Sequence, residues 1–281
     1  MDRTEELQKK TGFAPVNGTQ LAYDVMGQGF PLILIHGGLL DRRMWDAQVL
    51  EFATFAQVIR YDVRGYGQSQ MPQVPYSDVQ DLFELLRFLG IQKAAVLGLS
   101  LGSAIALDFT LHYPEMVETL LLAAPTINGY MVPTVAMRQR WQALSSAVEA
   151  NDRTRLFHLW ADDPMMPHAQ EYPAAYQQYR HLLKAYSFSH YFSRGLQQPL
   201  VPGARERLAA VQVPTLIIVG DRDEEEVSTV AELLSAEIAT SRKVVVPGVR
   251  HMLNMEQPDE FNRIVLEFLE TKLKRLFFRL P

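Results

Sequence analysis

The chain has 281 residues and carries 27 Lys and Arg against 32 Asp and Glu, which gives a formal net charge of -5 at neutral pH. That balance excludes a nucleic-acid binder that works by bulk phosphate neutralisation, since such a protein needs a concentrated basic surface. With 48% apolar and 21% charged residues, the chain has material for a large core, so disordered and fibrous classes are excluded; the length favours one large domain with an insertion.

The sequence contains no cysteine, which excludes disulfide scaffolds, thiolate metal sites and cysteine nucleophiles. Residues 1–10 are charged and no apolar run follows them, so no secretory signal is expected. No apolar stretch approaches the roughly 18 residues that suggest a membrane span. We therefore expect a soluble, cytoplasmic protein.

In chain order, the sequence alternates strand and helix signals. Asn17-Gly18 predicts a hairpin, because both residues tolerate the positive φ of its turn. Unbroken apolar runs are typical of strands covered on both faces, and a helical rhythm between Ser77 as N-cap and Gly90 as stop predicts a helix. We expect strands at 30–35, 58–63, 94–97, 119–124, 215–219 and 243–246, and helices at 77–90, 101–112, near 227–236 and from about 258.

This alternation implies right-handed crossovers and a largely parallel sheet with helices on both faces, an α/β fold. The stretch 125–207 interrupts it, being rich in aromatic residues, Met, Gln and His without buried strand-like runs. We interpret it as a helical cap between two parts of one core, 1–124 and 208–281. Its large apolar residues either pack its own helices or line a pocket under a lid: Met131, Trp141, Phe157, Trp160, Met165, Met166, Tyr176, Tyr186, Phe188 and Tyr191.

The clearest chemical signal is Gly98-Leu99-Ser100-Leu101-Gly102, a G-x-S-x-G pattern between an expected strand and an expected helix. In such a tight turn the serine adopts a strained backbone conformation that projects its hydroxyl, and flanking glycines avoid clashes with neighbouring chain. The following helix directs free N–H groups at an anion beside the serine. This context indicates that Ser100 is a nucleophile.

Here the chain resembles the α/β-hydrolase fold family, with a mostly parallel sheet of the eight-stranded type and a variable helical cap. The resemblance rests on the Ser100 elbow and on four more segments in the family's order. These are His36-Gly37-Gly38, Asp62-Val63-Arg64-Gly65-Tyr66-Gly67-Gln68-Ser69, Gly220-Asp221-Arg222-Asp223 and Gly248-Val249-Arg250-His251 with Asn254, Glu256 and Pro258.

The resemblance implies a catalytic triad of Ser100, Asp223 and His251, because a serine hydroxyl needs a base that a buried carboxylate orients. Asp221, directly after the strand, is expected to brace the turn. The oxyanion hole is expected from the backbone N–H groups of Leu101 and Gly38, with Leu39 as the alternative to Gly38. Members of this family that resemble cofactor-free peroxidases and small arylesterases commonly carry methionine where this chain has Leu101, which argues against that subfamily.

The remaining histidines show no metal-ligand spacing, so we expect no metal, and the triad chemistry requires no cofactor. His36 is expected to make a structural hydrogen bond in its loop. We predict that the substrate pocket is lined by Leu39, Met131, Trp141, Trp160 and Met165. The basic and apolar tail at residues 272–280 either ends a packed helix or touches a membrane surface or a partner.

These features predict a serine hydrolase for a small, fairly apolar carboxylic ester or lactone, acting through an acyl-enzyme. Two alternatives use the same triad: hydrolysis of a carbon–carbon bond in a ring-cleavage diketone, and cofactor-free perhydrolase activity. A third is a non-catalytic ligand-binding receptor on the same fold. No nucleic-acid partner is expected, and the sequence leaves the natural substrate and the oligomeric state open.

Overall fold

The structure is a computed structural model that describes residues 8–193 and 195–277. Within them, eight strands form one sheet in the order β1-β2-β4-β3-β5-β6-β7-β8. β2 is antiparallel to both β1 and β4, and the other neighbours are parallel. The strands are β1 Lys10–Val16, β2 Thr19–Met26, β3 Pro31–Ile35, β4 Gln57–Tyr61, β5 Ala94–Leu99, β6 Val117–Ala123, β7 Thr215–Gly220 and β8 Ser241–Val246.

The burial of the strands follows their composition. Every residue of β5 and of β7 is buried, as expected for apolar strands that are covered on both faces. β8, at the edge of the sheet, has only its last residue, Val246, buried. It begins two residues before the strand expected at 243–246. Its first residues include Arg242 and Lys243, charges that suit an edge strand but give no apolar signal.

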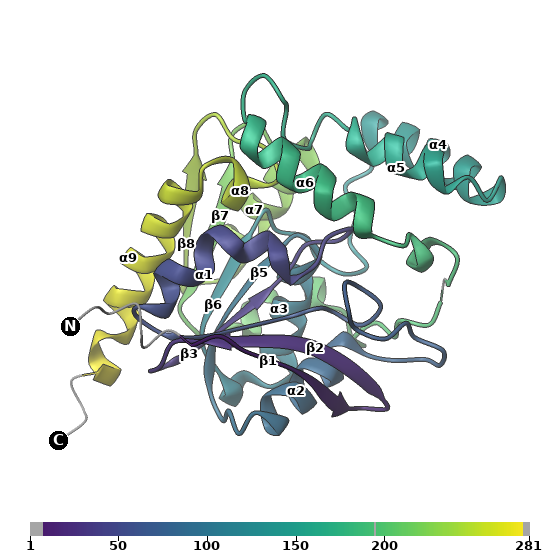
Figure 1. Cartoon of the computed structure of the whole chain (residues 1–281). Coiled ribbons are helices and arrows are strands. Elements are labelled where there is room, and N and C mark those ends of the chain that lie inside the picture. Colours follow the sequence, from purple (N-terminus) through teal and green to yellow (C-terminus); the bar gives the residue numbers. More distant parts are fainter. Residues whose placement is uncertain (1–7, 194, 278–281) are drawn as a thin grey trace.

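Helices cover both faces of this sheet (Figure 1). α1 and α9 pack against each other on one face, α2 packs against α3 on the other, and α7 packs on β7 and β8. α1 was not expected, because its inward face includes the polar Gln48 beside Val49 and Phe52, which breaks the apolar rhythm. The bounds are α1 Asp46–Ala53, α2 Asp78–Phe88, α3 Leu101–His112, α7 Glu225–Glu237, α8 Leu253–Glu256 and α9 Pro258–Phe277.

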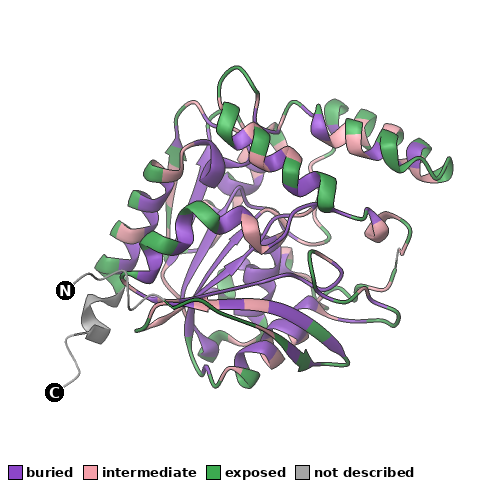
Figure 2. Cartoon of the chain, viewed as in Figure 1, coloured by how far each residue is buried: buried purple, intermediate pink, exposed green. Residues whose placement is uncertain are grey.

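Three further helices lie between β6 and β7 in the chain and sit above the edge of the sheet where the parallel strands end (Figure 1). They are α4 Val135–Glu149, α5 Arg153–Ala161 and α6 Pro173–Ala185. We call residues 125–207, which contain them, the cap segment. Its helices carry many exposed residues, whereas the central strands β3, β4, β5, β6 and β7 below are almost wholly buried (Figure 2). Short 3-10 turns occupy 42–45, 114–116, 189–191, 204–206 and 208–210.

The structure does not describe all of the residues at the two chain ends, for which the sequence makes predictions. Residues 1–7 lie outside the described residues, as do 278–281, and side chains from residue 273 onward are not described. The backbone of residues 272–277 forms the last turns of α9, so the tail at 272–280 begins as a helix, and whether it packs or touches a membrane surface stays a prediction. Across the described helices, none combines the length and the apolar character needed to cross a bilayer.

Candidate active site

Ser100 occupies a sharp turn between β5 and α3. Its backbone has φ +54° and ψ -115°, a conformation that costs about 1–3 kcal/mol and persists only where the surroundings enforce it. They do so through close chain approaches. A Cβ on Gly98 would lie 2.0 Å from the carbonyl oxygen of Gly102, and one on Gly102 would lie 2.1 Å from that of Ile35. Only glycine fits at these two positions, so the strand, the turn and the helix pack against one another.

The turn places two backbone donors near the serine. Leu101 is the first residue of α3, so its N–H has no acceptor within the helix and lies at the positive end of the helix dipole. Gly38 lies across from it, since a Cβ on Gly38 would be 3.9 Å from the Leu101 Cβ. The Gly37 N–H donates to Met44 Sδ at 3.1 Å. By contrast, the N–H of Gly38 has no acceptor among the described residues.

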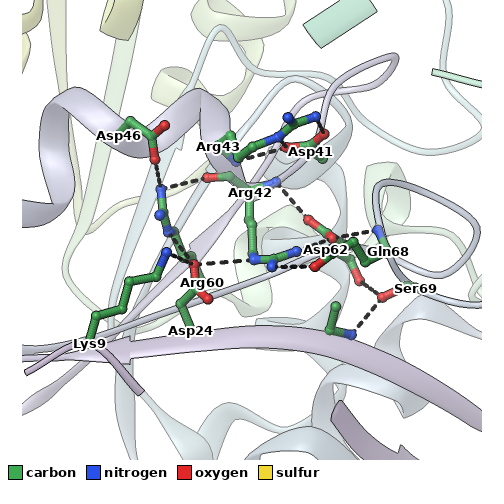
Figure 3. A network of polar contacts seen from close by, with 11 residues as sticks. Lys9, Asp24, Asp41, Arg42, Arg43, Asp46, Arg60, Asp62, Gln68 and Ser69 are labelled. Carbon is green, nitrogen blue, oxygen red and sulfur yellow. Dashed lines mark hydrogen bonds and ion pairs between the residues drawn. The ribbon is translucent and has the colours of Figure 1, made fainter. Parts of the chain in front are cut away.

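A network of ion pairs fastens the loop that contains Gly38 to the end of β4 (Figure 3). The buried carboxylate of Asp62 accepts hydrogen bonds from the Arg42 backbone N–H at 2.9 Å and from its guanidinium. Arg42 also pairs with Asp24 at 3.2 Å, and Asp24 pairs with Arg60 at 3.1 Å. Since buried charges need such partners, the loop has little freedom to move away from the sheet.

His36 stabilises the same loop rather than taking part in chemistry. Its Nε2 accepts the backbone N–H of Val63 at 2.9 Å, and its Nδ1 donates to the Gly37 carbonyl at 2.8 Å. Burial lowers its pKa despite the nearby charge of Asp62, which keeps the ring neutral. The expected structural hydrogen bond of His36 is thereby confirmed.

His251 and Asp223 form a buried pair. The Nδ1 of His251 lies 3.1 Å from both carboxylate oxygens of Asp223, whose side chain is fully buried. Because the carboxylate accepts the Nδ1 proton, Nε2 is left with its lone pair, as a general base requires. Asp221 accepts a hydrogen bond from the Gly248 N–H at 2.6 Å, so it braces the acid turn against the histidine loop, as expected.

The charges around His251 favour the protonated form of its imidazole. Burial alone lowers the pKa of His251, but the charge and hydrogen bond of Asp223, with further contributions from Glu224 and Glu256, outweigh it and raise the pKa above its ordinary value of 6.5. Such a balance of desolvation against a carboxylate partner is common at catalytic sites.

Ser100 and His251 line one cavity of about 520 Å³ between the sheet edge and the cap segment. That volume is typical of a small-molecule site. Its wall includes both backbone-donor candidates, Gly38 and Leu101, together with Leu39. Among the described lining residues none is Asp, Glu, Lys or Arg. The described wall therefore carries no permanently charged side chain, and its large apolar side chains are interspersed with hydroxyl, amide and imidazole groups.

The cap contributes much of this wall, with one correction to the expectation. Trp141, Trp160 and Met165 line the cavity. Met131 is not among the lining residues; it is 61% exposed and lies in the irregular segment before α4. Of the remaining apolar residues named for the cap segment, Phe157, Tyr176 and Phe188 line a second groove along α5 and α6, and Tyr186 lines both this groove and the cavity.

Sequence reasoning missed several wall residues. Tyr66 stacks on His190 with ring centroids 4.1 Å apart, and the His190 Nδ1 lies 3.1 Å from the Tyr186 hydroxyl. The loops after β4 and β6 also contribute, as does the residue after His251. The position of these loops in the sequence could have identified them as part of the wall, because loops at the carboxyl ends of parallel strands meet at one edge of the sheet. The missed residues are Tyr66, Thr126, Asn128, His190 and Met252.

Comparison with known proteins shows which families and structures this chain is similar to. A model of the alpha/beta hydrolase family matches residues 32–264. Serine hydrolase BPHL of Homo sapiens is 26% identical over 267 residues, which cover 91% of this chain and 84% of that protein. The 3-oxoadipate enol-lactonase 1 of Acinetobacter baylyi is 27% identical over 273 residues, which cover 94% and 95%. The crystal structure of a hydrolase from Pseudomonas aeruginosa PA01 matches with a TM-score of 0.77 and 28% identity, covering 92% of this chain and 98% of that one.

Proposed function

We propose that this chain, which belongs to the alpha/beta hydrolase family, is a serine hydrolase that cleaves small, uncharged, fairly apolar carboxylic esters or lactones. The observation that carries the proposal is that buried Asp223 holds Nδ1 of His251, while His251 and Ser100 line the same cavity. The names of the relatives, a serine hydrolase and an enol-lactonase, support the same reaction class.

In the proposed reaction, the Ser100 hydroxyl oxygen attacks the substrate carbonyl carbon as Nε2 of His251 takes its proton. Asp223 stabilises the resulting imidazolium, and the N–H groups of Gly38 and Leu101 bind the oxyanion. The imidazolium then protonates the leaving oxygen, which departs as an alcohol and leaves an acyl-serine. Water attacks this ester with His251 again as base, which releases the acid and restores the serine.

The neutral cavity supports a preference for uncharged acyl groups. Burial lowers the pKa of His190, so this ring stays neutral at pH 7. A carboxylate on the substrate would lose its hydration without gaining a lysine or arginine partner from the described cavity wall, which is costly. We therefore expect neutral esters and lactones to react faster than a lactone with a free carboxylate, such as the enol-lactone of 3-oxoadipate.

The experiment compares Ser100→Ala with Ser146→Ala, an exposed serine of α4, on p-nitrophenyl esters, neutral lactones, 3-oxoadipate enol-lactone and ring-cleavage diketones. We expect Ser100→Ala to lose at least about 10³-fold in kcat and to lose labelling by a fluorophosphonate. Ser146→Ala is expected to retain both.

Full ester turnover by Ser100→Ala would contradict the mechanism. Turnover confined to the diketones would replace it with carbon–carbon hydrolysis. Folded wild-type protein that forms no fluorophosphonate adduct and turns over nothing in the panel would favour the non-catalytic receptor.

A further inference from the structure

The residues proposed as acid and base lie on two separate connections of the chain. Asp223 lies between β7 and α7, and His251 lies in the loop between β8 and α8. Neither connection is itself a helix or strand, so their relative position depends on what packs against them. The cap segment supplies contacts to both.

Arg140 of α4 links the cap to these connections through two carboxylates. Its guanidinium donates to Asp163 at 2.6 and 3.0 Å, and to Glu224 at 2.8 Å through Nη1 and also through Nη2. Glu224 follows Asp223 directly in the chain, whereas Asp163 belongs to the loop between α5 and α6. One planar group thus binds both carboxylates in the forked geometry for which arginine is suited.

Each carboxylate leads on to one member of the acid–base pair. The Glu224 N–H donates to Asp223 Oδ1 at 2.8 Å. On the other branch, Asp163 Oδ1 accepts the Met165 N–H at 3.0 Å, and the Met165 carbonyl accepts the His251 N–H at 3.3 Å. Arg140 is therefore connected to Asp223 through one residue and to the His251 backbone through two.

We propose that Arg140 is a positioning residue, which holds the turn of Asp223 and the loop of His251 in register by binding Glu224 and Asp163 together. This inference rests on the hydrolase function proposed above. Arg140 does not line the cavity, so it acts through its two partners and not by touching substrate. The cap segment then has a second role beside forming the cavity wall, since it completes the geometry of the site.

Burial singles out this link from a second one nearby. The side chains of Arg140, Asp163 and Glu224 are 16%, 7% and 20% exposed. Glu171 of the cap pairs with Arg222 and Arg250, the residues before Asp223 and His251. The Arg250 side chain is 12% exposed, but that of the shared partner Glu171 is 37% exposed and that of Arg222 is 53% exposed. Exposed pairs are screened by solvent and salt, so we assign the stronger constraint to Arg140.

The charges around His251 give the proposal an electrostatic signature. The groups that act on its ring are the carboxylates of Asp223, Glu224 and Glu256, each of which raises its pKa, and Glu226 is coupled to it as well. Arg250 lies beside Glu256, whose carboxylate accepts the Arg250 N–H at 2.7 Å. Removal of the Arg140 charge leaves the negative charge of Glu224 without its cationic partner, which should raise the pKa of His251 further. Removal of the Glu224 charge acts in the opposite direction.

The test uses full-length Arg140→Gln, Arg140→Lys and Glu224→Gln, with Arg138→Gln as the matched control. Arg138 lies on the same helix, is exposed and bonds to the Pro133 carbonyl. On a neutral p-nitrophenyl ester, we expect Arg140→Gln and Glu224→Gln each to lower kcat by on the order of 10-fold to 100-fold through misplacement of the pair, with a much smaller change in KM. The acid limb of the kcat/KM profile should move to higher pH in Arg140→Gln and to lower pH in Glu224→Gln.

Arg140→Lys is expected to recover only part of kcat, since an ammonium cannot bind two carboxylates in the forked geometry, but it should restore the wild-type acid limb. Arg138→Gln should behave as wild type. Thermal unfolding shows whether each variant folds. If Arg140→Gln does not fold, the kinetics of Glu224→Gln test the proposal in its place.

Unchanged kcat in the folded variants, or acid limbs that shift in the same direction, would overturn the positioning role while leaving the hydrolase intact. A wild-type protein without ester turnover and without a Ser100 adduct would overturn the function, and with it this inference.

Discussion

At the scale of single residues, the proposed chemistry depends on an imidazole whose environment pulls its pKa in two directions. Desolvation favours the neutral ring, and Asp223 favours the charged ring and prevails. The base must be neutral to accept the serine proton, so a raised pKa makes the enzyme lose activity as pH falls through a value above 6.5. If the buried carboxylate oriented the ring without raising its pKa, the acid limb of the activity profile would lie at lower pH.

Asp223→Asn should therefore change both rate and pH profile. We expect kcat to fall by about 10³–10⁴-fold, because the ring loses its orienting and stabilising charge. The acid limb should move to lower pH, because burial then dominates the His251 pKa. Steady-state kinetics from pH 5 to 9 measures both.

Asp221→Asn is the matched control in the same turn, and it should stay within a few fold of wild type since asparagine still accepts the Gly248 N–H. If Asp223→Asn kept most of its activity while a variant of Glu224 or Glu226 lost it, the acid would be misassigned.

At the scale of elements, the elbow shows how a strand and a helix create a reactive position that neither has alone. β5 is buried throughout and α3 is almost entirely buried, so neither can shift to relieve the strained Ser100. The strained backbone of Ser100 is maintained by the close backbone contacts at Gly98 and Gly102. The same packing puts the positive end of α3 beside the serine.

Gly98→Ala tests this packing. The added methyl would meet the Gly102 carbonyl oxygen, so β5 and α3 must separate. We expect a loss of roughly 3 kcal/mol or more in the free energy of unfolding, together with loss of ester turnover. Urea unfolding provides the measurement. Gly203→Ala is the control, because a Cβ there has no neighbour within 4 Å and the backbone has φ -64°. Equal stability of the two variants would show that the elbow is not tightly packed.

At the scale of the whole molecule, stability depends on buried ionisable groups that join distant parts of the chain. Asp78, at the start of α2, accepts a hydrogen bond at 2.5 Å from the Gln197 amide of the cap segment. Burial, followed by the charge of Asp81, raises the pKa of Asp78 from 3.8 to about 7. Between these two values the folded chain retains a proton that the unfolded chain releases, so this group makes the fold less stable as pH rises, until the penalty is complete above pH 7.

Asp78→Asn removes the titration. At pH 5 the unfolded wild-type chain has already released this proton while the folded chain keeps it, so the variant should gain only part of the stability difference. At pH 8 we expect the variant to gain about 1–3 kcal/mol relative to wild type, because it avoids an ionised buried group. Urea unfolding at the two pH values measures this, with Asp259→Asn, an exposed acid of α9, as the control. A relative stability of Asp78→Asn that does not change with pH would contradict the assignment.

Much of the fold was predictable because its signals are local. The apolar runs of β3, β5 and β7 and the capped helix after Ser77 depend on neighbours within a few residues. α1 and the charged start of β8 were not predictable in this way, since packing against α9 and β4 and an edge position determined them.

The sequence by itself determined the family motifs, their order and the identity of the candidate nucleophile, base and acid, because each is encoded by a short segment with its own turn chemistry. The tertiary structure decided which side chains form the cavity wall, excluded Met131 from it and connected Arg140 to both flanks of the acid–base pair. Those contacts join residues tens of positions apart, and their pairing depends on how the cap helices pack on the sheet edge. No local periodicity or spacing records that packing.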